Sequence, residues 1–303
     1  MTPVGQPSFS VVVPAYRRPG ALVACMRALA LQDHRDLEVI VVDDGSPEPL
    51  APAARAAAAG LALTVHRQGN AGPAAARNAG GALASGDYLA FTDDDCRPRP
   101  GWVTALAERA RAHPGALLGG ATVNALPVNP YATASQALVS YLYRAPTGAG
   151  RFFATNNIAV PRDAFREAGG FDASYPDAAG EDREFCLRWS GQGREMVFVA
   201  DAVVDHAHHL DLRGFVRQHT AYGRGAARFH GQRAPGRGPF TQLEPVGFYL
   251  GVLRAPFADP DVRHPAPVAA LLALSQAATA VGFLAERARR RRVTPERSRP
   301  AAR

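Results

Sequence analysis

Cysteine is scarce in this chain of 303 residues, and its three cysteines lie far apart. Cys25, Cys96 and Cys186 form no C-x-x-C pair, so the sequence predicts neither a disulfide framework nor a zinc site, and it favours a reducing compartment. The stretch MTPVGQPSFSVVVP lacks a basic region and has only a short apolar run. We therefore expect no signal peptide and a cytoplasmic location, at the inner face of the membrane if there is membrane contact.

Net positive charge is also scarce outside the carboxyl-terminal tail. The formal net charge is +7, and residues 286–303 alone contribute +6, because they hold eight Arg and two Glu. A nucleic-acid-binding domain spreads basic side chains over one face of its fold, so we expect no nucleic-acid partner. The hydrophobic fraction of 47% and the charged fraction of 20% are ordinary for a globular chain, which excludes disordered and collagen-like classes.

The first hundred residues show the pattern of a parallel sheet. Short β-branched runs at 9–13 and 39–42 are separated by a helical stretch at 21–31, which is a βαβ arrangement. Further strands are predicted at 63–65 and 88–91, with a helix at about 72–84 between them. This half therefore predicts a doubly wound α/β fold.

The second half of the chain is less regular. It predicts an apolar stretch at 152–160, helices at 182–189 and 213–229, and a strand at 197–204. The Gly-, Pro- and Arg-rich stretch GQRAPGRGPF then marks a break. We accordingly divide the chain into a main domain at 1–230, a linker or mobile loop region at 231–265, and an apolar helix with an Arg-rich tail at 266–303.

Residues 266–285 form a long apolar segment, and an Arg cluster at 287–292 follows directly. The segment is about long enough to span a bilayer. Its many alanines make it only weakly hydrophobic, so a helix in the membrane interface or one packed on the protein fits equally well. We expect peripheral membrane contact through 266–292, with the arginines near anionic lipid. The alternative is a solvated tail.

Polar residues follow three of the predicted strands at their carboxyl ends, where open α/β sheets bind ligands: Pro14 to Tyr16, Asp43 to Ser46, and Asp93 to Asp95. Three adjacent carboxylates repel one another unless a cation neutralises them. Mg²⁺ and Mn²⁺ prefer oxygen ligands and can bridge such carboxylates to a diphosphate. The triplet taken alone is equally consistent with an acidic turn.

Two further motifs fit a site for a nucleotide. In EVIVVDDGSPEP, Asp44 can accept hydrogen bonds from a base or a ribose hydroxyl, although an exposed turn is the plain alternative. In GNAGPAAARNAG, a glycine-rich turn leads into a helix whose Arg77 can reach a phosphate with a bidentate fork. A solvated arginine is the alternative there.

These motifs in this order resemble the family 2 glycosyltransferases, with DDGS, N-x-G-x-x-x-A-R-N and the acidic triplet, then GGFD at 169–172, GEDREFCLRW at 180–189 and VDHAHH at 204–209. The resemblance spans roughly residues 8–230. It implies a GT-A fold, which is Rossmann-like with a mostly parallel central sheet flanked by helices, here with a carboxyl-terminal helical extension. It also implies a nucleotide-binding half at about 8–100 and an acceptor half at about 101–230.

The same resemblance implies an inverting transfer of a sugar from a nucleotide diphosphate donor, most simply a UDP-sugar, to an acceptor hydroxyl. The acceptor would be a saccharide, a lipid-linked compound or a protein, in cell-surface polysaccharide or glycoconjugate synthesis. The sequence R-Q-H-x-x-Y-G-R-G replaces the Q-x-x-R-W of processive synthases, which favours a single transfer per encounter.

Individual roles follow from the resemblance. It assigns the nucleotide sugar to Pro14, Tyr16, Asp44, Arg77, Asp93 and Asp94. It assigns Mn²⁺ or Mg²⁺ to Asp95, with His206 as a further ligand, although a histidine at a strand end is often simply hydrogen-bonded. Asp182 is the implied general base. A helix N-cap is the competing explanation for the Glu181 and Asp182 pair.

An acceptor pocket or lid is predicted from four residues: Asn157, Glu181, Trp189 and Arg224. For Trp189, core packing is the alternative, given its helical spacing from Phe185. Two other functions remain open. A metal-dependent nucleotidyltransferase would usually carry a lysine-containing phosphate loop where this chain reads PAYRRPG. A non-catalytic nucleotide-sugar-binding module would not need the carboxylates at 95 and 182.

Overall fold

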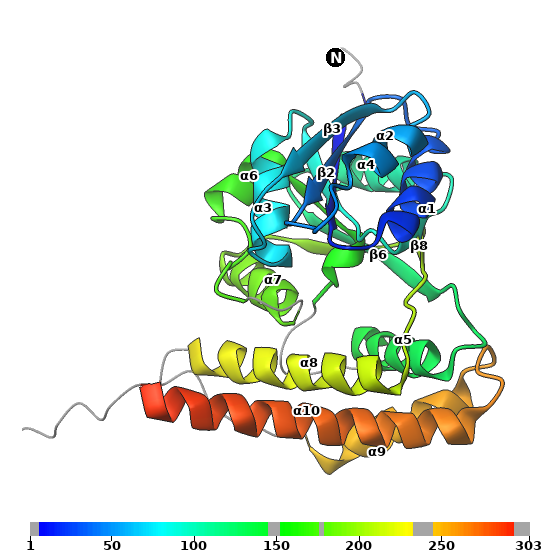
Figure 1. Ribbon diagram of the computed structural model, residues 1–303, viewed down its shortest axis with the longest axis vertical. Coiled ribbons are helices and arrows are strands. Elements are labelled where there is room, and N and C mark those ends of the chain that lie inside the picture. Colours follow the sequence, from blue (N-terminus) through cyan, green and yellow to red (C-terminus); the bar gives the residue numbers. More distant parts are fainter. Residues whose placement is uncertain (1–5, 145–151, 176–178, 233–244, 294–303) are drawn as a thin grey trace, which may run out of the picture.

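A single mixed sheet forms the centre of the molecule. The structure, a computed structural model, describes residues 6–144, 152–175, 179–232 and 245–293 (Figure 1). The eight strands of the sheet have the order β3-β2-β1-β4-β7-β6-β8-β5. Their bounds are β1 (Phe9–Ala15), β2 (Leu37–Asp43), β3 (Ala62–Arg67), β4 (Tyr88–Phe91), β5 (Cys96–Pro98), β6 (Leu117–Asn124), β7 (Ile158–Pro161) and β8 (Met196–His206).

The strands of the first half are parallel, as the sequence predicts. Strand β1 pairs in parallel with β2 and β4, and β2 pairs in parallel with β3. Beyond β4 the sheet becomes mixed, because β7 runs antiparallel to both β4 and β6, and β5 runs antiparallel to β8. The Rossmann-like α/β architecture is thus confirmed.

Helices cover both faces of the sheet. On one face lie α1 (Pro19–Ala30), α2 (Ala51–Ala57) and α4 (Trp102–Ala112), whose buried residues share a hydrophobic cluster with Val11 and Val13 of β1. On the other face lie α3 (Pro73–Leu83), α6 (Arg162–Glu167) and α7 (Glu181–Gly191), whose buried residues share a second cluster with Val12. Because both faces are covered, β1 is apolar along nearly its whole length instead of alternating with polar residues.

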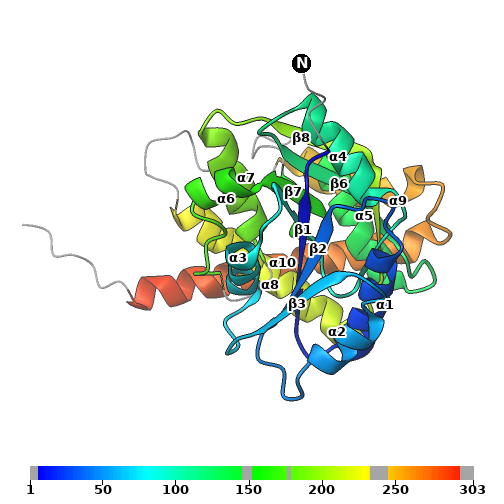
Figure 2. The same cartoon turned by 90° about the horizontal axis from the view of Figure 1, so that it is seen from above.

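Four helices form a layer below this α/β part, and we call them the helical platform: α5 (Pro130–Arg144), α8 (Leu212–Gln232), α9 (Val246–Ala258) and α10 (Pro265–Val293). They have a core of their own, which includes Leu138, Phe215, Val252 and Leu272. Figure 1 shows α8 and α10 side by side beneath the sheet, and Figure 2 shows from above that α10 passes under it. The platform adds the helical extension that the sequence predicts.

One part of the sequence prediction needs correction. Helix α9 lies inside 231–265, where we expected a linker or mobile loop. It forms because the apolar stretch VGFYLGVL buries Val252 in the platform core and packs the Phe248 ring 5.5 Å from the Tyr141 ring. The stretch GQRAPGRGPF that suggested the linker lies mostly outside the described residues, which resume at residue 245.

The apolar carboxyl-terminal segment packs on the protein along one side. Helix α10 runs parallel to α8, and the two backbones meet at glycines. A Cβ atom on Gly223 would lie 1.9 Å from the carbonyl oxygen of Thr279, and one on Gly282 would lie 2.0 Å from that of Thr220. Further along, the Glu286 carboxylate accepts a hydrogen bond of 3.0 Å from Arg228. The α8–α10 contact therefore depends on small residues and one buried carboxylate.

The Gly282→Ala substitution should destabilise the protein by about 1–3 kcal/mol, because the added methyl group overpacks the α8–α10 contact. Alanine is a better helix former than glycine by about 1 kcal/mol, so helix propensity alone would give the opposite sign. The matched control is Gly247→Ala in α9, where a Cβ atom meets nothing within 4 Å. Urea unfolding of both variants gives the comparison. Equal stability of the two would show that α8 and α10 are not in close contact.

Candidate functional site

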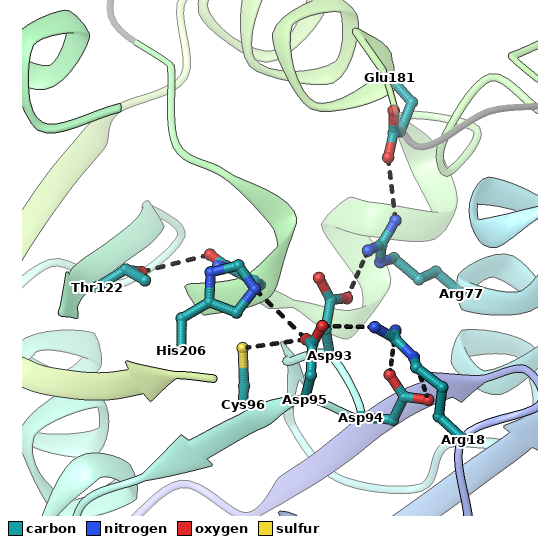
Figure 3. A network of polar contacts seen from close by, with 10 residues as sticks. Arg18, Arg77, Asp93, Asp94, Asp95, Cys96, Thr122, Glu181 and His206 are labelled. Atoms are coloured by element: carbon teal, nitrogen blue, oxygen red, sulfur yellow. Dashed lines mark hydrogen bonds and ion pairs between the residues drawn. The ribbon is translucent and has the colours of Figure 1, made fainter. Parts of the chain in front are cut away.

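The acidic triplet lies in the turn between β4 and β5, at the carboxyl end of the parallel strands. Strand β5 pairs with the end of β8, and the register places Cys96 opposite His206. The imidazole of His206 therefore comes beside the triplet, with Nε2 3.4 Å from Oδ1 of Asp95 (Figure 3). The sequence separates these two residues by more than a hundred positions, and the strand pairing brings them together.

Arg18 neutralises part of the triplet. It lies just before α1, and its guanidinium donates to Oδ2 of Asp95 at 2.5 Å and to Oδ2 of Asp94 at 3.2 Å, with a third contact to Oδ1 of Asp94. About half of its side chain remains exposed. Arg18 was not among the site residues predicted from the sequence. Its position in YRRPG, directly after the end of a predicted strand, is the sequence feature that could have marked it as a site residue.

The two carboxylates that Arg18 bridges differ in protonation. Burial raises the pKa of Asp94 to about 7, against the opposing charge of Arg18. Burial would also raise the pKa of Asp95, but the hydrogen bond with His206 and the charges of His206 and Arg18 outweigh it and hold that pKa below its usual range. Asp95 is therefore ionised at neutral pH, as a metal ligand must be.

Arg77 of α3 links the triplet to the start of α7. Its side chain is buried and donates to Oδ1 of Asp93 at 2.7 Å and to Oε1 of Glu181 at 3.1 Å. Among the described residues, neither Nε of Arg77 nor Oε2 of Glu181 has a hydrogen-bond partner. These two buried polar atoms are available to a ligand. The predicted contact of Arg77 with a donor phosphate stays a prediction.

Glu181 and Asp182 are the first two residues of α7 and do not occupy its N-cap position, but Oδ1 of Asp182 accepts a hydrogen bond of 2.7 Å from the backbone N–H of Arg183. The residue before α7 is Gly180, with φ of 97°, and it makes no side-chain capping bond. Burial and the nearby charge of Asp182 raise the pKa of Glu181 to about 7, and burial raises the pKa of Asp182 as well. A carboxylate with a raised pKa is a stronger proton acceptor. The geometry is thus compatible with a general base at this position.

The end of β2 has a structural role that the sequence did not reveal. The carboxylate of Asp44 accepts hydrogen bonds from the N–H groups of Ala71 and Gly72, each 2.9 Å, and from Nε2 of Gln68 at 2.7 Å. It thereby holds the glycine-rich turn before α3 in place. Pro14 is buried within β1, while Tyr16 is exposed just beyond it. Their predicted contacts with a nucleotide stay predictions.

A cavity of about 530 Å³ lies between the sheet edge and the helical platform. Six of the predicted site residues line it: Arg77, Asp93, Asp95, Glu181, Asp182 and His206. Seven do not: Pro14, Tyr16, Asp44, Asp94, Asn157, Trp189 and Arg224. The structure therefore gathers the predicted metal ligands and the predicted base at one cavity, and it leaves the strand ends of β1 and β2 outside.

The acceptor predictions for Asn157 and Trp189 need correction. Asn157 is fully buried, where its Oδ1 accepts from the Trp102 indole and its Nδ2 donates to two backbone carbonyls, so all of its amide atoms are used within the protein. Trp189 is fully buried in the core beside Phe185. Arg224 is exposed on α8, away from the cavity lining. Asn156 lines the cavity in place of its neighbour.

Side chains from the platform complete the cavity. Gln218 and Tyr222 of α8 line it, and Nε2 of Gln218 donates to the Tyr222 hydroxyl at 2.6 Å. The ring of His208 stacks on that of His206 with centroids 4.7 Å apart. Burial and the charge of His206 lower the pKa of His208 to about 4, so it is neutral at pH 7.

Asp95, Cys96 and His206 offer ligand atoms that lie within 4.8 Å of one another, a spacing that fits one metal ion. Burial raises the pKa of the Cys96 thiol well above its usual value, so the sulfur stays protonated and is a poor ligand. Asp95 and His206 supply the oxygen and nitrogen that suit Mn²⁺ better. These two side chains could hold the ion that the sequence predicts.

Comparison with known proteins identifies the family. Glycosyl transferase family 2 matches residues 10–168, and glycosyl transferase family group 2 matches residues 91–284. A pre-mycofactocin glycosyltransferase of Mycobacterium tuberculosis is 31% identical over 225 residues, which is 72% of this chain and 46% of that protein. The validoxylamine A glucosyltransferase of Streptomyces hygroscopicus is 27% identical over 263 residues, covering 71% of this chain and 62% of that protein. This chain thus spans about half the length of these relatives.

Solved structures share the fold. The mannosyltransferase PcManGT from Pyrobaculum calidifontis, in complex with GDP-Man and Mn²⁺, aligns with a TM-score of 0.60 and 21% identity over 95% of this chain and 81% of its own. S. aureus TarS 1–349, in complex with UDP-GlcNAc, aligns with a TM-score of 0.55 and 16% identity over 96% of this chain and 93% of its own. The match over nearly the whole chain extends the likeness to the platform.

The His206→Ala substitution should weaken Mn²⁺ binding at least tenfold, because it removes one of the two predicted protein ligands and the hydrogen bond that holds down the pKa of Asp95. Titration of free Mn²⁺ by electron paramagnetic resonance measures the dissociation constant directly. The matched control is His209→Ala, three residues further along and exposed. Similar Mn²⁺ affinities for the two variants would exclude His206 as a ligand.

Proposed function

This chain belongs to glycosyltransferase family 2, and we propose that it is an inverting enzyme that transfers a sugar from a nucleotide diphosphate to an acceptor hydroxyl. One observation carries the proposal: Asp95, His206 and Asp182 line the same cavity, although they come from three separate parts of the chain. The transfer needs a metal site and a base within reach of one sugar, and the side chains of Asp95, His206 and Asp182 are suited to these two roles.

The proposed reaction is a single displacement at the anomeric carbon. Asp182 accepts the proton of the acceptor hydroxyl as its oxygen attacks, and the configuration inverts. The raised pKa of Asp182 suits a base that must stay ionised until the hydroxyl begins to lose its proton. A Mn²⁺ or Mg²⁺ ion held by Asp95 and His206 would neutralise the charge on the departing diphosphate.

The charged residues around this base keep its geometry fixed. Arg77 joins Asp93 to Glu181, so the triplet and the start of α7 are held at a set separation. We propose that the nucleotide lies over the ends of β1 and β2, at Tyr16 and Asp44, outside the cavity. The donor sugar then points past Asp93 and Asp94 toward the cavity mouth. Since GDP-Man and UDP-GlcNAc are bound in related folds, a nucleotide-sugar donor is well supported, and UDP is our choice of carrier.

Two other functions fit less well. A nucleotidyltransferase of similar architecture would use a lysine-containing phosphate loop, and this chain contains no lysine at all. A binding module without turnover would not need the raised pKa of Asp182. Release of a nucleoside diphosphate from a nucleotide sugar in the presence of Mn²⁺ supports the transferase, whereas release of pyrophosphate supports the nucleotidyltransferase.

We also propose that α9 and α10 contact a membrane surface. Among the described residues, α10 is the one helix long and apolar enough to cross a bilayer. Its packing along α8 fits a helix that lies in the interface better than one that spans. Its outer side exposes Leu274, Val281 and Leu284, and α9 adds Val246 and Phe257. No charged residue occurs from 265 to 285, and arginines follow at once, which favours anionic lipid.

Substitution of Asp182 by Asn should lower kcat by two to four orders of magnitude, because it removes the proton acceptor and little else. The donor dissociation constant should stay within about threefold of wild type, since Asp182 does not hold the nucleotide. Transfer is followed by nucleoside diphosphate release, and donor binding by calorimetry.

The control for this variant is Asp163→Asn, a change of the same chemistry at an exposed carboxylate of α6. We expect its kcat to equal that of wild type. If the Asp182→Asn variant keeps the turnover of wild type, Asp182 is not the general base. In that case Glu181→Gln, at the neighbouring carboxylate, becomes the variant to measure.

The double variant Val281→Glu/Leu284→Glu should bind vesicles containing phosphatidylglycerol at least tenfold more weakly than wild type, because each burial of an apolar side chain is worth about 1.5–3 kcal/mol. Flotation with vesicles measures the bound fraction. The control is Leu31→Glu/Leu83→Glu, which alters two exposed leucines of the α/β part.

Vesicles of phosphatidylcholine alone give the second comparison. If the protein binds these vesicles more weakly than the anionic ones, the Arg cluster beyond residue 286 contributes to membrane binding. If both double variants bind as well as wild type, the outer side of α10 is not the contact surface.

A further inference from the structure

One part of the cavity has no role in proton transfer or metal binding. The cavity lining includes polar side chains of α5, α8 and α10, among them Gln136, Gln218 and Gln276, as well as apolar ones. Five of the apolar side chains form what we call the apolar wall: Leu138, Val139, Leu142, Phe152 and Phe248. Three of these come from α5, one from the segment before β7 and one from α9. Their chemistry calls for an apolar group of a ligand.

Three residues of the apolar wall belong to the platform core or pack against it, whereas Phe152 packs against the core between the sheet and α3, α6 and α7. Leu138 belongs to the platform core, and Leu142 and Phe248 pack against it while remaining only partly buried. Helix α5 presents Leu138 and Leu142 on one side because they are four residues apart. The Tyr141 hydroxyl donates to the carbonyl oxygen of Phe248 at 3.3 Å and so fixes α9 against α5. The wall is therefore preformed.

The wall begins directly beside the proposed base. Phe152 packs on Tyr143 of α5, with ring centroids 5.6 Å apart, and its other neighbour is the guanidinium of Arg183, 4.6 Å from the ring centroid. Arg183 follows Asp182 in α7. A molecule whose hydroxyl reaches Asp182 thus has its remaining part against Phe152 and the side chains beyond it.

The donor does not fit this wall. A nucleotide and its diphosphate are polar, and the residues predicted to bind them at the ends of β1 and β2 lie outside the cavity. Leucine and valine offer no hydrogen bonds to the hydroxyls of a long saccharide chain. The cavity volume of about 530 Å³ lies within the range of pockets that enclose most of a small molecule.

From these contacts we infer that the acceptor is amphipathic: a hydroxyl-bearing head that reaches Asp182, joined to an alkyl or aromatic group that lies against the apolar wall. The inference rests on the proposed function, because it assigns the acceptor of the same site. It narrows the acceptor from any saccharide, lipid-linked compound or protein to one with an apolar group next to the reacting hydroxyl.

A series of n-alkyl β-D-glucosides with methyl, butyl, hexyl and octyl chains tests this with the full chain, below the concentrations at which micelles form. Calorimetry should show affinity rising about threefold to fourfold for each added CH₂, the increment expected for burial of a methylene group. With a working donor, KM should fall in the same order. Equal affinity for the methyl and octyl compounds overturns the inference.

Two variants test whether the alkyl chain binds at the apolar wall. Val139→Trp fills part of the cavity and should abolish the dependence on chain length, so that octyl and methyl glucosides bind within about threefold of each other. The matched control is Val128→Trp, at an exposed position just before α5, which should keep the full dependence. If Val139→Trp does not fold by circular dichroism, the series with wild type still decides the matter.

Two further outcomes show where the alkyl chain binds and whether the site transfers a sugar. If Val281→Glu/Leu284→Glu removes the dependence on chain length, the alkyl chain binds the outer side of α10 and the inference is wrong. If octyl glucoside binds in the cavity but no nucleotide sugar yields a nucleoside diphosphate, the apolar site stands and the proposed transfer fails. If the enzyme transfers a sugar but its KM for the acceptor does not change with chain length, the proposed transfer stands and the inference of an amphipathic acceptor is wrong.

Discussion

The neutralisation of the acidic triplet shapes the whole site. Asp93, Asp94 and Asp95 lie close together at a buried strand end, and each is met by a cation or a hydrogen-bond donor from another part of the chain. Arg18 reaches it from the start of α1, Arg77 from α3 and His206 from the end of β8. Because three carboxylates at such a position repel one another, these partners must be in place before the turn is stable. The same partners bring the sheet, α3 and α7 together at the cavity.

Carboxylates outnumber arginines at the cavity, where Asp93, Asp95, Glu181 and Asp182 face Arg18, Arg77 and Arg183. A divalent ion bound by oxygen ligands would complement these carboxylates. The electrostatics thus agree with a family whose reaction transfers a sugar away from a diphosphate. The low pKa of Asp95 and the raised pKa of Asp182 divide the carboxylates into one suited to hold a metal and one suited to accept a proton.

The helical platform connects this chemistry to the surroundings of the protein. Its inner side supplies the apolar wall of the cavity, and its outer side exposes apolar residues of α9 and α10 followed by arginines. The proposed amphipathic acceptor and the proposed membrane contact are compatible, because each requires apolar side chains of the platform next to polar ones. The close contact at Gly223 and Gly282 packs α10 directly on α8.

The sequence by itself determined the parallel half of the sheet, because β-branched runs and glycine-rich turns encode local structure through a few neighbouring residues. It also predicted roles for Asp95, His206 and Asp182, because they lie in motifs that are short and contiguous, and the structure places all three at one cavity. Tertiary structure alone decided the rest. Arg18 was missed because its partners are more than seventy residues away. Asn157 and Trp189 were placed at the acceptor pocket because only the packing of the turn before β7 and of α7 decides which side of each element is buried. Helix α9 was taken for a linker because its apolar residues are buried only through contacts with α5 and α10, which the sequence does not show. Local patterns fix elements and motifs, whereas the cavity and its apolar wall arise from contacts between segments far apart in the chain.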